Sequence, residues 1–209
     1  MSMTRRKLLT VVAAGAGLVA APAYAQHMTH TAPGACPSDG TPMQFIPKKP
    51  ADPTPTQNDI AKYPTCPYCG MSRSQFHHAR MLVHYGDDLP DGTCSLHCAA
   101  ISLSLNVDRG PKAIYVADFA TQGDQKALIE VAQATFLVGS ALSGVMTKRS
   151  KVAYGSEAAG KAAQTAHGGE LMNFDQALLA AHTDMAQDVA MIRKMREERR
   201  KKMPMEHKG

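Results

Sequence analysis

The pattern of apolar and polar residues predicts short strands and helices followed by one long helix. Strands are predicted where apolar residues alternate or form short runs, at 79–85, 113–119, the C-terminal half of 128–138, 152–154 and 171–174. Helices are predicted where apolar residues recur every three or four positions, from Ser95 onward, at 156–167 and at 175–202. The Gly and Pro residues of 86–92 predict turns. The stretch 128–138 also permits a helix through its alanines.

The predicted C-terminal helix, residues 175–202, combines an apolar stripe with a basic end. Asp175 is the N-cap candidate. The stripe consists of Leu178, Leu179, His182, Met185, Val189, Ile192 and Met195. We interpret its methionines as a packing face rather than as a series of copper ligands. The basic end, residues 193–202, favours contact with an acidic partner.

Residues 1–25 have the features of a cleaved export signal. Basic residues precede a short apolar segment, and Ala23-Tyr24-Ala25 forms a cleavage site of the A-x-A type. That segment is shorter than the roughly 20 residues of a membrane-spanning helix. The Arg5-Arg6 pair resembles a twin-arginine signal, and an ordinary secretion signal fits nearly as well. We therefore expect a periplasmic protein.

The segment that follows, residues 26–63, is rich in proline and has almost no periodic apolar pattern, which predicts an extended and poorly ordered arm. With 44% hydrophobic residues in 209, the remainder is large enough to bury a core. The formal net charge of +5 falls to +2 when the three basic residues of the signal are removed. Nucleic acid is therefore not an implied partner.

Four of the five cysteines form two closely spaced pairs. Cys66 and Cys69 form a C-x-x-C motif, and Cys94 and Cys98 form a C-x-x-x-C motif whose second thiol would face back toward the first on a helix. This spacing resembles a small Cys₄ zinc site. An oxidising compartment also permits disulfides, and because five is odd at least one thiol is free, metal-bound or paired with another chain. Cys36 lies apart, in a polar segment.

Thioether groups add a preference for copper. Met71 lies two residues after Cys69, and thiolate with thioether is a soft donor set that favours Cu(I) over Zn(II). Met146 follows a loop of small residues at 139–144. Both ends of the chain carry further copper-binding groups, which we interpret as solvated: His27 and His30 near the start, and Met203, Met205 and His207 at the end.

Several short motifs together resemble the NosL family, the accessory proteins of nitrous-oxide reductase assembly. In chain order they are Cys69-Gly70-Met71 after Cys66, Ile114 to Asp118, Phe136 to Ser140 leading to Gly144 to Thr147, and Gly168-Gly169-Glu170 before Phe174-Asp175. The match covers roughly residues 63–179. The combination of Cys-Gly-Met with a downstream methionine is more specific than either feature alone.

The resemblance implies a non-enzymatic periplasmic Cu(I) metallochaperone that delivers copper for the copper-sulfide centre of nitrous-oxide reductase. It implies an α+β fold of two small, related sheet-and-helix modules and, as Cu(I) ligands, Cys69, Met71 and Met146. The expected organisation is a signal (1–25), an arm (26–63), a metal-binding domain (64–174), and a basic helix with a Met/His tail (175–209). Family members are commonly lipoproteins, whereas this sequence shows no lipobox.

Two alternatives follow from the cysteines themselves. The first is a zinc-binding structural or interaction module built on Cys66, Cys69, Cys94 and Cys98. The second is a thiol-disulfide oxidoreductase that uses Cys66 and Cys69, although nothing near this loop supplies a second catalytic group.

Overall fold

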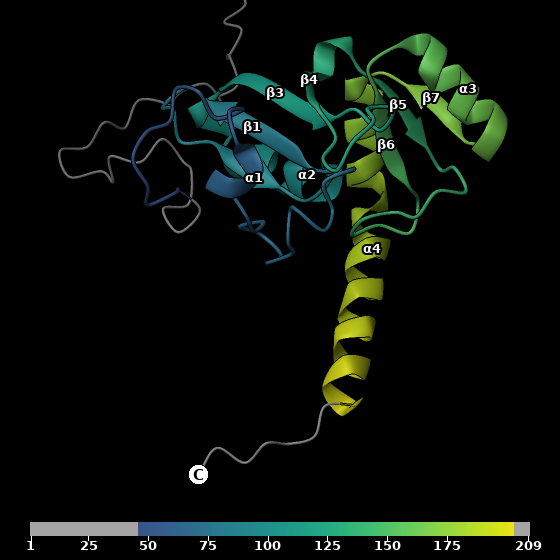
Figure 1. Ribbon diagram of the computed structural model, residues 1–209. Coiled ribbons are helices and arrows are strands. Elements are labelled where there is room, and N and C mark those ends of the chain that lie inside the picture. The colour runs from purple at the N-terminus through teal and green to yellow at the C-terminus, as the bar shows by residue number, and fades with distance from the viewer. Residues whose placement is uncertain (1–45, 203–209) are drawn as a thin grey trace, which may run out of the picture. The chain divides into compact units, whose positions relative to one another are not determined.

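The computed structural model describes residues 46–202 and places seven strands there in two antiparallel sheets (Figure 1). The first sheet has the order β2-β1-β3-β4. Its strands are β1 (Met81–Tyr85), β2 (Asp91–Thr93), β3 (Pro111–Ala117) and β4 (Leu128–Glu130). In the register of this sheet, Met81 lies between Thr93 and Val116.

The second sheet has the order β6-β5-β7. Its strands are β5 (Thr135–Val138), β6 (Lys151–Tyr154) and β7 (Glu170–Met172). Phe136 of the central strand pairs with Ala153 on one side and Met172 on the other. A bridge between Asp118 and Ala153 connects the two sheets, and the backbone N–H of Phe119 donates to the carbonyl of Ala153 (2.8 Å).

Helices surround these sheets: α1 (Asp59–Lys62), α2 (Leu96–Leu105), α3 (Glu157–His167) and α4 (Phe174–Lys202), with short 3₁₀ turns at Val107–Arg109 and Val131–Gln133. α2 packs against β1 and β2, α3 packs against the second sheet, and α4 contacts α2, β5 and β7 before it continues beyond them (Figure 1). The α+β prediction with a long C-terminal helix is confirmed. Among residues 46–202, no helix is long and apolar enough to cross a membrane.

A single main core joins both sheets to α2 and α4. It includes Tyr85 of β1, Leu96 of α2 and Phe136 of β5, all at most 2% exposed. α4 enters this core through small residues, Ala177, Ala180 and Ala181, which let the helix approach closely. The predicted apolar stripe of this helix is therefore only partly correct. Leu178 and Met185 pack against the core, whereas Leu179 is 68% exposed and His182 is exposed.

Several predicted element boundaries were wrong. Residues 91 and 92, predicted as part of a turn, instead form the edge strand β2 together with Thr93, because they pair with β1. The stretch 128–138 is a strand in its C-terminal half, as predicted, but β4 and a 3₁₀ turn precede that strand. The long helix is capped by Asn173 rather than Asp175, since the Asn173 side chain accepts from the N–H of Gln176 (2.9 Å) and the Gln176 side chain accepts from the N–H of Asn173 (3.0 Å).

A buried ion cluster ties the end of the proline-rich segment to the first sheet. The Asp59 carboxylate accepts hydrogen bonds from Arg73 (2.8 Å) and Arg80 (2.9 and 3.0 Å), and all three side chains are at most 7% exposed. Residues 59–62 form α1, so the prediction of an extended arm fails for this part of 26–63. The polar pattern concealed this helix because only one apolar residue, Ile60, is buried beside the charged Asp59. The predicted signal, Cys36, His27, His30, Met203, Met205 and His207 lie outside the described residues.

Candidate metal centre

The loop from Cys66 to Met71 folds into a tight turn that directs two thiols to one place. The N–H of Gly70 donates to the carbonyl of Cys66, and the N–H of Cys66 donates to the carbonyl of Met71, both at 2.9 Å. Gly70 has a φ of 76°, which a glycine adopts without steric cost. The sequence Cys-Pro-Tyr-Cys-Gly-Met therefore folds locally into a loop suited to present Cys66 and Cys69 together.

The second pair of cysteines lies where β2 passes into α2. Cys94 follows the last residue of β2, and Cys98 is in the first turn of α2. Their Sγ atoms are 3.8 Å apart, as the helical spacing predicted. Both side chains are fully buried.

The structure brings all four cysteines together. Their Sγ atoms lie within 4.8 Å of one another, and those of Cys69 and Cys94 are 3.4 Å apart. A tetrahedral zinc ion with Zn–S bonds of about 2.3 Å requires sulfur atoms about 3.8 Å apart, so the donor set fits a four-coordinate thiolate site. All four are free thiols, and Cys69 is the one that is partly exposed. Cys69 is therefore the member through which an ion can enter or leave.

The crowding of four thiols divides their pKa values. Contacts with the thiols of Cys69, Cys94 and Cys98 lower the pKa of Cys66. The pKa of Cys69 is also lowered: contact with Cys66 opposes ionisation, but contacts with Cys94 and Cys98 and the N–H of Met71 outweigh it. Contacts with Cys66 and Cys69 raise the pKa of Cys94 and of Cys98. Without a metal, the first pair is therefore the easier to ionise and the second pair holds its protons more tightly.

A buried hydrogen-bond network fixes the first cysteine loop to the sheet. The Tyr68 hydroxyl, located between the two cysteines, donates to the Asp91 carboxylate. That carboxylate also accepts from the Ser102 hydroxyl of α2 (2.7 Å). Burial raises the pKa of Asp91. The network connects the loop, β2 and α2, which are the three elements that supply the cysteines.

Met71 and Met146, the thioethers named from the sequence, both pack against the cysteine cluster. Met146 has a φ of 61°, a left-handed conformation that non-glycine residues rarely adopt and that costs about 1 kcal/mol or more. The turn before it depends on Gly144, because a Cβ there would lie 2.2 Å from the carbonyl oxygen of Thr147. A strained backbone thus places the Met146 side chain beside the cysteines.

Cys69, Met71 and Met146 line one cavity of about 790 Å³, which α4 closes on the opposite side. Met191, Met195 and two arginines of α4 belong to this lining. Sequence reasoning assigned the methionines of this helix to packing. Nothing in the helical pattern distinguishes a stripe that covers a core from a stripe that covers a cavity, so the α4 wall could not be located from sequence.

His97 and Asp188 form a buried contact between α2 and α4 that the sequence analysis also missed. The His97 Nδ1 and Asp188 Oδ2 atoms are 3.4 Å apart, and each residue is at most 3% exposed. Burial lowers the pKa of His97, and the nearby Asp188 carboxylate opposes this shift in part. The other oxygen of Asp188 accepts the backbone N–H of Lys148 (3.0 Å). Asp188 therefore connects the turn that carries Met146 to the helix that follows Cys94.

Replacing Asp188 with alanine is expected to destabilise the protein by about 1–3 kcal/mol, because it removes a buried carboxylate and the part-buried hydrogen bond that this group accepts from the N–H of Lys148. Urea unfolding of the metal-free protein measures the loss. Gln187→Ala, at an exposed neighbouring position of the same helix, is the matched control and is expected to stay within about 0.5 kcal/mol of the parent. Equal stability of the two variants would contradict the role assigned to Asp188.

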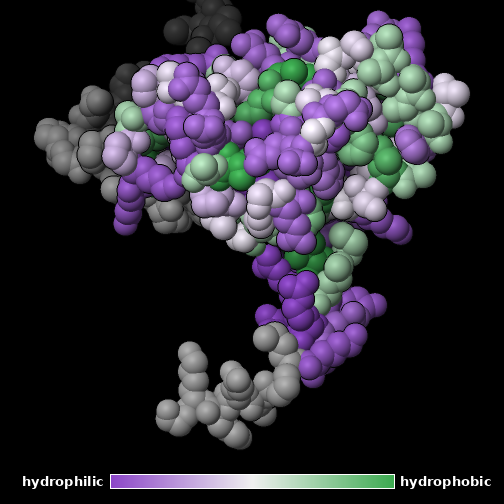
Figure 2. Space-filling view, in the orientation of Figure 1, coloured by the Kyte–Doolittle hydropathy of each residue, from purple (hydrophilic) through white to green (hydrophobic). Residues whose placement is uncertain are grey.

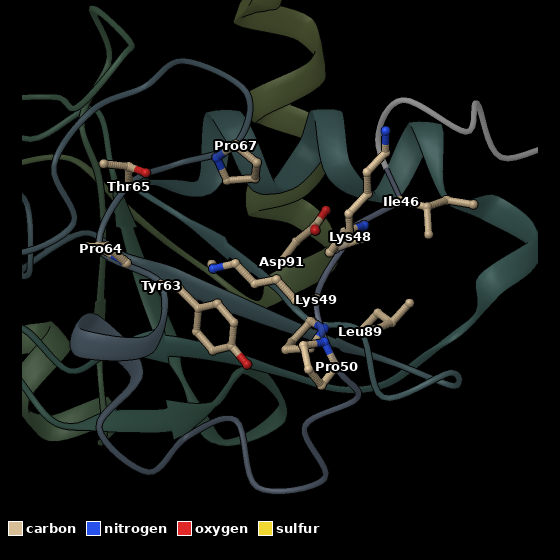
Figure 3. A pocket seen from close by; sticks show the side chains of 13 residues that line it. Ile46, Lys48, Lys49, Pro50, Tyr63, Pro64, Thr65, Pro67, Leu89 and Asp91 are labelled. Atoms are coloured by element: carbon tan, nitrogen blue, oxygen red, sulfur yellow. The ribbon is translucent and has the colours of Figure 1, made fainter.

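A second pocket, of about 410 Å³, is lined in part by Pro64, Thr65 and Pro67 at the start of the first cysteine loop (Figure 3). Prolines, Tyr63, Lys48 and Lys49 line it, and Figure 3 shows the Lys49 side chain extending between Asp91 and Tyr63. None of its lining residues carries a sulfur or imidazole group. Its chemistry therefore does not suit a soft metal ion.

A comparison with family models agrees with the sequence motifs. A model of the NosL family matches residues 57–180, more than half of the chain. The crystal structure of the copper chaperone NosL from Shewanella denitrificans is similar, with 22% sequence identity, a TM-score of 0.47, and coverage of 62% of this chain and 96% of that one. The search of proteins with curated functions gave no significant match. On the family match, this chain belongs to the NosL family.

Proposed function

We propose that this protein is an exported copper chaperone that binds Cu(I) through Cys69, Met71 and Met146 and delivers it for assembly of the copper-sulfide centre of nitrous-oxide reductase. The NosL family is one of chaperones rather than enzymes, so the thiol-disulfide oxidoreductase alternative is not retained. The observation that carries the proposal is the strained backbone of Met146, which holds a thioether in the cavity that Cys69 and Met71 also line.

The donor set suits a metal that must be passed on. One thiolate with two thioethers is a soft set that Cu(I) accepts at low coordination number, and a partner can take the ion by exchanging one ligand at a time. Cys69 is partly exposed, whereas Cys66, Cys94 and Cys98 are buried. An incoming ligand from a partner would therefore reach copper on Cys69 first.

The second candidate function is zinc binding by the four cysteines, in a structural or partner-binding role. The observation that favours it is the distance of at most 4.8 Å between any two of the four sulfur atoms. Cys69 belongs to both donor sets. The two candidates are therefore separated by residues that belong to only one set, Met146 for copper and Cys98 for zinc.

Replacing Met146 with leucine is expected to weaken Cu(I) binding by about tenfold or more, equivalent to ~1.4 kcal/mol, while Zn(II) binding changes little. Leucine keeps the size of the side chain and removes the sulfur ligand. Isoleucine is unsuitable, because a β-branched residue is strained at a φ of 61°. Anaerobic competition against a chromogenic Cu(I) chelator measures the affinity.

Met172→Leu is the matched control, because Met172 is a partly buried methionine that packs against the main core and lies outside the cavity lining. It should bind Cu(I) like the parent. The copper-loaded Met146→Leu and Met172→Leu variants are then each mixed with copper-free nitrous-oxide reductase to compare copper transfer. Unchanged Cu(I) affinity in Met146→Leu, with Zn(II) binding lost in Cys98→Ser, would overturn the copper site and support the zinc candidate.

A further inference from the structure

The α4 wall of the copper cavity carries its own pair of thioethers. Met191 and Met195 are four residues apart, so their side chains lie on the same face of the helix, and both line the cavity that Cys69, Met71 and Met146 line from the other side. They follow the last residue that the NosL family model matches, residue 180. They therefore lie outside the segment that the family model matches.

These two methionines do not serve the main core. Met195 is 54% exposed and Met191 is partly exposed. By contrast, Met185, six residues before Met191 in the same helix, packs against the core. Figure 2 shows hydrophobic residues where α4 leaves the sheets and hydrophilic residues toward its end. Two flexible, polarisable side chains therefore lie at the exposed edge of the cavity that Cys69, Met71 and Met146 also line.

The charge of the same wall indicates weak binding there. Arg196 and Arg199 also line the cavity. A thioether is neutral, so Cu(I) held by Met191 and Met195 keeps its full positive charge close to two guanidinium groups. Cu(I) on the Cys69 thiolate is neutralised instead. Copper at the α4 wall is therefore held less tightly than copper at the inner site, which is the order of affinities required of an entry and exit position.

We propose that Met191 and Met195 form a second, weaker Cu(I) site through which copper passes to and from the inner ligands Cys69, Met71 and Met146. The inference rests on the proposed copper-chaperone function and extends it. Transfer is a ligand exchange in which one Cu–S bond forms as another breaks, and copper stays Cu(I) throughout. The site predicts that the protein takes up a second equivalent of Cu(I) after the first.

The test follows methionine methyl groups in the full mature protein, labelled with [methyl-¹³C]methionine and titrated anaerobically with Cu(I). The methyl signals of Met71 and Met146 should move with the first equivalent, and those of Met191 and Met195 with the second. In Met191→Leu/Met195→Leu the second equivalent should bind at least about tenfold more weakly, while affinity for the first changes less than about threefold. Copper transfer to a soluble chelator should slow in the same variant.

Met185→Leu is the control, since it removes a thioether from the same helix without touching the cavity lining, and it should leave both equivalents and the transfer rate unchanged. If the second equivalent moves only Met203 and Met205, or survives the double replacement, the second site is refuted while the inner site stands. If the first equivalent fails to move Met71 and Met146, the proposed function itself fails. The two failures are thus distinguishable in one titration.

Discussion

Zinc binding by the four cysteines is expected to weaken by about ten-thousandfold or more when the pH is lowered from 8 to 6. The pKa values of Cys94 and Cys98 are raised, so both residues carry protons in the metal-free protein across this range. A zinc ion bound to four thiolates must displace both protons. The bound form then holds at least two protons fewer than the free form, so affinity rises with pH by about a factor of one hundred per unit or more.

Copper binding to Cys69 with two thioethers should respond much less to pH. Cys69 is the one ligand of the three that can carry a proton, since thioethers take up none in this range, and its pKa is lowered, so copper binding releases at most one proton. The Cu(I) affinity is therefore expected to change by at most about a hundredfold over the same two units, against about ten-thousandfold or more for zinc. The direction is the same for both metals, and the number of protons released distinguishes them.

Chelator competition at pH 6, 7 and 8, with proton release counted by calorimetry in buffers of different ionisation enthalpy, measures both slopes. Cys98→Ser provides the control, because it removes one of the two protonated thiols and leaves Cys69, Met71 and Met146 in place. Its zinc affinity should fall sharply and its copper affinity should not. A zinc slope below one proton per ion would contradict the division of pKa values among the thiols.

The sequence predicted those parts of the site that local spacing controls. The C-x-x-C turn depends on Gly70, and the Cys94–Cys98 contact depends on one helical turn, so both could be expected without a structure. The convergence of the two pairs was expected only from their resemblance to metal-site spacing. The alternating residues of 79–85 likewise predicted β1 closely, because the two-residue repeat of a strand fixes the face on which each side chain lies.

The remaining parts depend on contacts between distant residues, which periodicity does not record. α4 enters the core through alanines, so its large apolar residues misled the assignment of its buried face. The contact of His97 with Asp188 spans α2 and α4, and no motif joins them. The role proposed for Met146 could be inferred only from family resemblance, because its left-handed backbone is not visible in the sequence.

Replacing Asp59 with alanine is expected to destabilise the metal-free protein by about 3–5 kcal/mol, because two guanidinium groups would stay buried without their counter-ion. The Arg73 side chain is fully buried and also donates to the carbonyls of Tyr63 (2.8 Å) and Thr93 (3.2 Å). Thr93 precedes Cys94, and the N–H of Arg73 donates to the carbonyl of Pro64 (2.8 Å), two residues before Cys66. Arg73 therefore holds the backbone that leads into both cysteine pairs.

The loss should lower the melting temperature by about 10 °C, since each kcal/mol corresponds to roughly 2–4 °C in a domain of this size. Melting is followed with a chelator present, so that bound metal adds nothing to the stability. Asp59→Asn keeps the shape and one acceptor, and its loss should be intermediate. Asp108→Ala removes an exposed carboxylate and should leave the melting temperature almost unchanged. If Asp59→Ala melted with this control, the ion cluster would not be what fixes α1 and the two cysteine pairs to the sheet.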